Sequence, residues 1–117
     1  MIRREELTVT TDSLGAGTVV STSPISGLVY YVRNNGATFG STADFTLTRL
    51  ASDGGGTILN VADAVGPWEY SPRYAEHSIG GGSVGADAFI PVDGHVRLIV
   101  AQGGSVSTGV VHVFYLT

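Results

Sequence analysis

The sequence has no cysteine, no lysine and little charge of either sign. Six arginines and ten acidic residues among 117 make charged residues 14% of the chain, with a formal net charge of −4. Without cysteine the chain can form neither a disulfide framework nor a thiolate metal site. Because the arginines are scattered and the balance is acidic, the composition argues against a nucleic-acid-binding protein.

Long apolar runs are also missing. No run approaches the ~20 residues that a membrane-spanning helix needs, so we expect no membrane partner. The first residues, MIRREELTVTTD, lack the apolar core of a signal peptide, which predicts a protein made in the cytoplasm without export by that route. The length favours one domain over residues 1–117, and an apolar share of 43% excludes disorder.

What the chain has in quantity is alternation of apolar and polar residues with period two, which is typical of half-buried strands. The pattern predicts strands near residues 5–11, 18–22, 27–36, 43–50, 57–61 and 86–92, followed by two more at the C-terminal end. Two prolines, Pro67 and Pro72, exclude a central strand between them. A short helical turn is expected around Val61–Val65. About seven or eight strands at this spacing predict an all-β sandwich or barrel.

The last 25 residues, DGHVRLIVAQGGSVSTGVVHVFYLT, hold two apolar runs around a Gly/Ser-rich middle. If these runs pair as an antiparallel hairpin with its turn near Ser105–Val106, one face carries only large apolar side chains, as a buried sheet face requires. That face consists of Val96, Leu98, Val100, Val111, Val113 and Tyr115.

The opposite face of the predicted hairpin is more apolar than a solvated surface should be. It consists of His95, Arg97, Ile99, Ala101, Val110, His112, Phe114 and Leu116. We expect a loop, the N-terminal segment with Ile2, or a second subunit to cover it. The subunit alternative predicts contacts at Ile99, His112, Phe114 and Leu116, with Arg3 and Arg4 contributed by an N-terminal arm over residues 1–5.

Residues that carry chemistry are present but are not arranged for it. In the predicted hairpin, His95 and His112 are four residues apart, roughly 13 Å, which is too far for a shared metal ion. There is no Gly-x-Ser-x-Gly elbow, and residues 80–85 lack the lysine and helix of a phosphate-binding loop. Adjacent Glu5 and Glu6 point to opposite faces of a strand. We therefore predict no catalytic residue, no cofactor and no metal site, and hence no enzyme.

The aromatic segment WEYSPRY is the one feature that suggests a ligand. Trp and Tyr rings beside an arginine and a glutamate can stack on a sugar and bond its hydroxyls. The candidate glycan or partner contacts are Trp68, Tyr70, Arg73 and Tyr74. The favoured alternative is that the tryptophan plugs the end of a sandwich.

The absence of cysteine, the Gly/Ser/Thr-rich strands and the ending GHVRLIVAQGGSVSTGVVHVFYLT resemble small structural proteins of tailed-bacteriophage virions, of the head decoration or stabilisation type. The resemblance implies a single-domain antiparallel β-sandwich, jelly-roll or tulip-like. It also implies a non-enzymatic cement protein on the capsid surface that contacts the major capsid protein or other virion subunits and forms a homo-oligomer such as a trimer. A fibre, tail or neck component and a carbohydrate-binding module are the alternatives.

Overall fold

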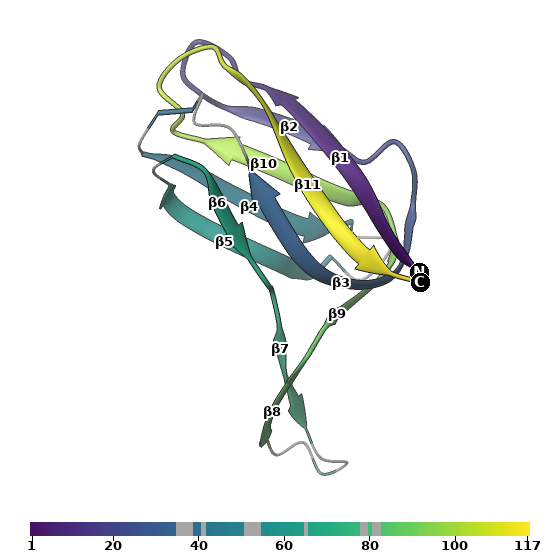
Figure 1. Cartoon of the computed structure of the whole chain (residues 1–117). Helices are drawn as coiled ribbons and strands as arrows, with labels where there is room; N and C mark the ends of the chain where they lie inside the picture. Colours follow the sequence, from purple (N-terminus) through teal and green to yellow (C-terminus); the bar gives the residue numbers. More distant parts are fainter. Residues whose placement is uncertain (35–38, 41, 51–54, 65, 78–79, 81–82) are drawn as a thin grey trace.

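The computed structural model describes residues 1–34, 39–40, 42–50, 55–64, 66–77, 80 and 83–117. These residues form strands and turns and contain no helix (Figure 1), so none of them belongs to a helix that could cross a membrane. The strands are β1 (Ile2–Thr10), β2 (Gly17–Val20), β3 (Ile25–Asn34), β4 (Ala43–Arg49), β5 (Thr57–Ala64), β6 (Trp68–Tyr70), β7 (Tyr74–His77), β8 (Ser83–Ala88), β9 (Ile90–Gly94), β10 (Val96–Ala101) and β11 (Thr108–Leu116).

Two antiparallel sheets form a sandwich, which confirms the predicted fold class. We name each sheet after one of its central strands. The β11 sheet has the order β1-β11-β3-β6, with β9 also paired to β3, and the β10 sheet has the order β2-β10-β4-β5. The helical turn predicted around Val61–Val65 is wrong over residues 61–64, because β5 continues as a strand to Ala64; Val65 lies outside the described residues. The number of strands also exceeds the predicted seven or eight, since the segments around residues 68–77 and 83–94 form four short strands.

The core lies between the two sheets and is built by period-two alternation. The fully buried side chains with large volume are Leu7, Val9, Ile25, Val29, Val32, Leu47, Val96, Leu98, Val100, Val111 and Val113. Burying one such aliphatic side chain stabilises the fold by about 1.5–3 kcal/mol relative to leaving it exposed. Both C-terminal strands therefore present to the core the face that the alternation predicted.

The predicted hairpin between the last two strands is wrong. β10 pairs with β2 and β4, whereas β11 pairs with β1 and β3. The connection over residues 102–107 crosses from one sheet to the other (Figure 1), with Gln102 and Gly104 at positive φ. The two apolar faces thus meet across the core and do not lie side by side in one sheet.

The predicted N-terminal arm covers residues 1–5, and of these residues 2–5 lie in β1. This strand pairs with β11 over its whole length, from Ile2 opposite Leu116 to Thr10 opposite Thr108. The backbone amide of Thr117 donates to the carbonyl of Met1 at 2.9 Å, so the two ends of the chain lie side by side (Figure 1).

The free edge of β3 is shared by two short strands. β9 pairs with Ile25–Val29, and β6 pairs with Val32–Asn34. Between them the chain leaves the sandwich as a two-stranded hairpin of β7 and β8, residues 74–88, which we call the arm (Figure 1). Its strands pair with each other and with no other described strand. The arm gives the molecule its elongated extents of 48 × 27 × 24 Å.

Candidate interaction surface

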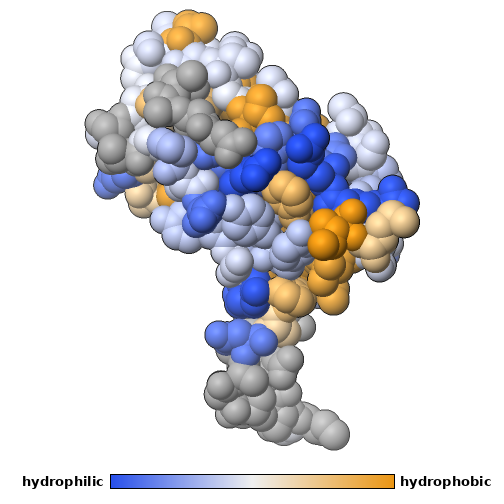
Figure 2. Space-filling view, viewed as in Figure 1, coloured by the Kyte–Doolittle hydropathy of each residue, from blue (hydrophilic) through white to orange (hydrophobic). Residues whose placement is uncertain are grey.

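The outer face of the β11 sheet is the strongest candidate for a functional surface. Its residues alternate with core residues along β1, β11 and β3, and no described segment packs over them (Figure 1). Figure 2 shows a hydrophilic band across this face, with an apolar group beside it toward the chain termini. Cross-strand pairing arranges the face as three rows of side chains.

The first row is apolar. Ile2 lies opposite Leu116, which lies opposite Leu28, which in turn lies opposite Pro91 of β9. Ile2 is 62% exposed and Leu28 is 41% exposed. Four adjacent strands therefore offer one continuous apolar row to the surroundings, where a solvated sheet face would be polar.

The second row is aromatic and depends on a bulge. The register between β3 and β11 shifts at Phe114/Tyr115, so that Tyr30 is an extra residue on β3. Because a bulge suspends the alternation, both Tyr30 and Tyr31 contact Phe114, with ring centroids 6.4 and 5.5 Å away. Arg33 places its guanidinium carbon 5.1 Å from the centre of the same ring.

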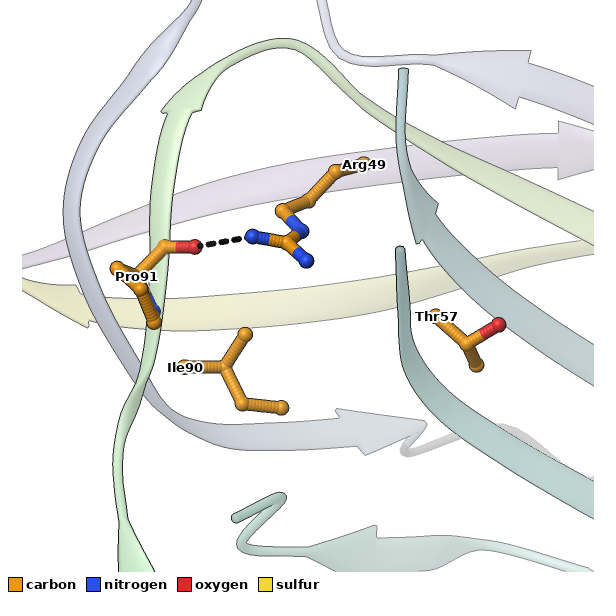
Figure 3. A pocket seen from close by; sticks show the side chains of 4 residues that line it. All are labelled: Arg49, Thr57, Ile90 and Pro91. Carbon is orange, nitrogen blue, oxygen red and sulfur yellow. Dashed lines mark hydrogen bonds between the residues drawn. The ribbon is translucent and has the colours of Figure 1, made fainter. Parts of the chain in front are cut away.

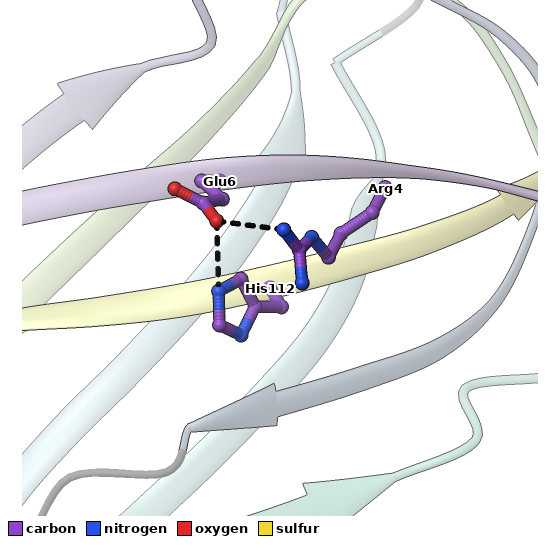
Figure 4. Close-up of polar contacts among 3 residues, drawn as sticks. All are labelled: Arg4, Glu6 and His112. Atoms are coloured by element: carbon purple, nitrogen blue, oxygen red, sulfur yellow. Dashed lines mark ion pairs between the residues drawn. The ribbon is translucent and has the colours of Figure 1, made fainter.

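The third row is charged. Glu6 lies within ion-pair distance of two neighbours: its Oε1 is 3.0 Å from Arg4 Nη2 and 3.4 Å from His112 Nε2 (Figure 4). Glu69 on β6 accepts a hydrogen bond from the Tyr31 hydroxyl, and this bond raises the pKa of Tyr31 above its usual range. Polar groups of both signs thus border the aromatic row on one side, while the apolar row borders it on the other.

The structure brings together only part of the predicted contact set. Arg4, His112, Phe114 and Leu116 share the outer face of the β11 sheet. Ile99 lies on the outer face of the other sheet, between Thr18 and Thr46, so the predicted single patch containing it is wrong. The reason is that the chain crosses from one sheet to the other between β10 and β11. Arg3 alternates with Ile2 and Arg4 along β1 and points to the other side of that strand.

The predicted aromatic site around residues 68–74 is divided between separate locations. Trp68 packs against the core, 5.1 Å from the Phe45 ring centre, as the packing alternative proposed. Tyr70 is 47% exposed and its ring lies 5.9 Å from that of Trp68. Arg73 lies at the base of the arm over Phe89. Tyr74 begins β7, and its side chain lies outside the described residues.

Four residues near this surface were not predicted from the sequence: Tyr30, Tyr31, Arg33 and Phe89. Two consecutive tyrosines in an otherwise alternating strand were the available signal, since only a bulge places both on one face. Nothing local in the sequence indicated that Phe89 would lie 6.2 Å from the Tyr30 ring. Within the described residues, no group of three His, Asp or Glu side chains lies close enough to hold a metal ion.

Comparison with solved structures shows a shared fold at low sequence identity. A chitosan-binding module of a chitosanase/glucanase from Paenibacillus sp. IK-5 aligns with a TM-score of 0.50 at 11% identity, covering 92% of this chain and 74% of the module. A mitogen derived from Yersinia pseudotuberculosis aligns at 0.48 and 11% identity, covering 100% and 88%. The carbohydrate-binding module CBM6cm-2 of Cellvibrio mixtus lichenase 5A aligns at 0.45 and 12% identity, covering 99% and 87%. No protein-family model and no curated protein matches the chain. The first likeness supports the β-sandwich fold.

Proposed function

We propose that this protein is a non-enzymatic structural subunit that binds neighbouring protein through the outer face of its β11 sheet. The observation that carries the proposal is the apolar row Ile2–Leu116–Leu28–Pro91 beside the aromatic row at Phe114. Contiguous exposed apolar surface on a soluble protein marks an interaction site. Aromatic side chains and arginine, which are enriched at interfaces, lie next to it.

The assembly we propose is a tailed-phage virion, in which the protein would act as a decoration or cement protein on the capsid surface. The resemblance of the C-terminal 25 residues supports this assignment. Burial of the outer face against the major capsid protein or a second copy would stabilise the assembled state only, because binding free energy is added where the partner is present. No cofactor is needed for such a role.

Self-association provides the first test, and the chain offers a matched pair of variants. Leu28 and Val20 are both strand residues and both 41% exposed, but Leu28 lies on the outer face of the β11 sheet and Val20 on that of the β10 sheet. We expect light scattering at micromolar concentration to show an oligomer that Leu28→Asp dissociates and Val20→Asp preserves. A wild-type monomer at every concentration, or equal effects of the two variants, would contradict self-association through this face.

The virion assignment has its own test. Mass spectrometry of gradient-purified phage particles, from the phage that encodes this chain, should detect it in constant ratio to the major capsid protein. If a treatment releases this protein from the particles while their tails stay attached, the protein is located on the head. Its absence from intact particles would exclude the virion role while leaving the interaction surface to be explained.

Carbohydrate binding is the second candidate. The observation that favours it is the group of Tyr31, Phe114, Arg33 and Glu69, in which ring faces lie beside hydrogen-bonding groups on an open sheet face. The solved relative with a TM-score of 0.50 is described as chitosan-binding, but at 11% identity this likeness extends to the fold alone. A glycan array, followed by titration of wild type and Tyr31→Ala, separates the two candidates: saturable binding lost in the variant would favour a glycan.

A further inference from the structure

A crevice opens on the flank of the sandwich, where β9 of one sheet lies across from β4 and β5 of the other. It is open to the surroundings, has a volume of about 320 Å³ and is lined by Arg49, Thr57, Ile90 and Pro91 (Figure 3). This volume falls at the lower end of the range of ligand sites in proteins. The crevice shares Pro91 with the apolar row of the β11 sheet, whereas Arg49 and Thr57 belong to the other sheet.

The Arg49 side chain lies in the crevice and uses few of its N–H donors in hydrogen bonds with the described residues. Its backbone amide donates to the Gly56 carbonyl at 2.9 Å, and its Nη1 donates to the Pro91 carbonyl at 3.4 Å. The Nε atom is buried and has no hydrogen-bond partner among the described residues. A guanidinium has five N–H donors, and within the described part of the chain the bond to Pro91 is the side-chain hydrogen bond that Arg49 makes.

The position of Gly56 keeps the space around this guanidinium free. A Cβ atom at residue 56 would lie 2.2 Å from Nη2 of Arg49, closer than van der Waals contact permits. Glycine therefore lets the side chain lie where its fork faces the crevice, and any other residue here would have to displace the guanidinium.

The remaining lining defines the chemistry of a matching ligand. In the described part of the chain no carboxylate lies within ion-pair distance of Arg49. Ile90 is buried, and Pro91 offers an apolar ring beside it. Thr57 lies on the opposite wall (Figure 3). A partly buried guanidinium that has no counter-ion among the described residues matches a carboxylate, which accepts two parallel N–H bonds from one fork.

We propose that this crevice binds a carboxylate group attached to a short apolar stem. The guanidinium of Arg49 donates to the two carboxylate oxygens, and the stem packs against Ile90 and Pro91. A small organic acid and an acidic side chain of a neighbouring protein carry the same chemistry, so both are tested as sources.

The test uses the full chain, ¹⁵N-labelled, with isobutyrate as the probe of a free acid and a blocked glutamate pentapeptide as the probe of a protein side chain. Either probe should shift the amide signals of Arg49, Thr57 and Ile90 with saturation, while neutral isobutyramide and sodium chloride should not. Hydrogen bonds to charged groups contribute about 1.5–3 kcal/mol, so Arg49→Gln should weaken binding roughly tenfold or more. Arg49→Lys, which keeps the charge without the fork, should fall between wild type and Arg49→Gln.

Arg97→Gln is the matched control, because Arg97 is exposed on the outer face of the β10 sheet, away from the crevice. This variant should bind both probes as tightly as wild type does. The dispersion of the ¹⁵N spectrum reports whether each variant is folded. Saturation by the free acid identifies a small-molecule site, and saturation by the peptide alone identifies a protein contact. No saturable shift with either probe, or an equal shift with chloride, would overturn the proposal.

Discussion

Arg73 lies over the ring of Phe89, with its guanidinium carbon 4.1 Å from the ring centre. Arg73 directly precedes β7 and Phe89 directly follows β8, so this contact joins the two ends of the arm at its base. Nη1 of Arg73 also donates to the carbonyls of Tyr30 and Pro72 at 3.3 and 2.9 Å. The bulged edge of β3 and the base of the arm are thereby fastened to each other.

Arg73→Ala should loosen the arm while leaving the sandwich intact. Cation–π contacts at exposed sites contribute about 0.5–1 kcal/mol, which corresponds to a roughly two- to fivefold faster opening. The rate at which the arm opens is measured by hydrogen exchange of the amides in residues 83–88, with core amides of β11 as the internal reference. Arg97→Ala, at an exposed arginine on the other sheet, should change neither the exchange of the arm amides nor that of the core amides. Unaltered exchange in Arg73→Ala would show that the contact does not brace the arm.

Removal of the arm should leave a folded sandwich. Because β7 and β8 pair with neither large sheet, replacing residues 74–88 by an Asn-Gly turn breaks no ladder of the core. We expect cooperative urea unfolding to persist. An isolated two-stranded hairpin is marginally stable in water, and its free edges suit pairing with another chain. The shortened chain should therefore shift toward monomer in light scattering; an insoluble product would show that the arm is needed for folding itself.

The alternation predicted the core of β10 and β11 because a strand that is buried on one face must carry apolar residues at every second position. It could not predict which strand pairs with which. Two runs that each have one apolar face can lie side by side in a sheet or face to face across a core, and both arrangements bury the same residues, such as Leu98 and Val113. The predicted hairpin failed on this ambiguity, and the placement of Ile99 failed with it.

The candidate surface was predicted in part for a related reason. Phe114 and Leu116 were found because they are apolar at outward positions of a clear strand. Tyr30 and Tyr31 were missed because their outward placement depends on a bulge opposite β11, which is a property of the pair of strands. The crevice at Arg49 depends on β4 and β9, which come from different sheets and are far apart in the sequence.

The turn between β1 and β2 should respond to acid through Asp12. Its Oδ1 accepts hydrogen bonds from the backbone amides of Ala16 and Leu14 at 3.1 and 2.9 Å. These hydrogen bonds lower the pKa of Asp12 below its ordinary value of 3.8. A lowered folded-state pKa means that the stabilisation is fully present above pH 3.8 and is lost as the pH falls through the folded value. Asp12→Asn removes the charge, so its stability should lack this dependence.

Urea midpoints of wild type and Asp12→Asn between pH 2 and pH 6 test this turn. We expect wild type to be the more stable protein at pH 6 and the difference between the two midpoints to shrink toward pH 2. The difference isolates Asp12 from the other carboxylates, which both proteins share. A difference that is constant across the range would mean that the charge of Asp12 does not contribute.

Gly27 of β3 should be difficult to replace, because there is no space for a side chain at this position. A Cβ atom there would lie 2.1 Å from the carbonyl oxygen of Leu116, a backbone atom that can move only if β3 and β11 separate. Overpacking of this kind costs about 1–3 kcal/mol, so Gly27→Ala should lower the urea midpoint markedly. Ser26→Ala, at the exposed neighbouring position, is the control and should stay close to wild type. Equal urea midpoints for Gly27→Ala and Ser26→Ala would show that the sheet accommodates the extra methyl group without opening.

The same separation of β3 and β11 would displace Leu28 and Leu116 in the apolar row. Gly27→Ala should therefore weaken self-association under conditions where its far-ultraviolet circular dichroism still shows a folded protein.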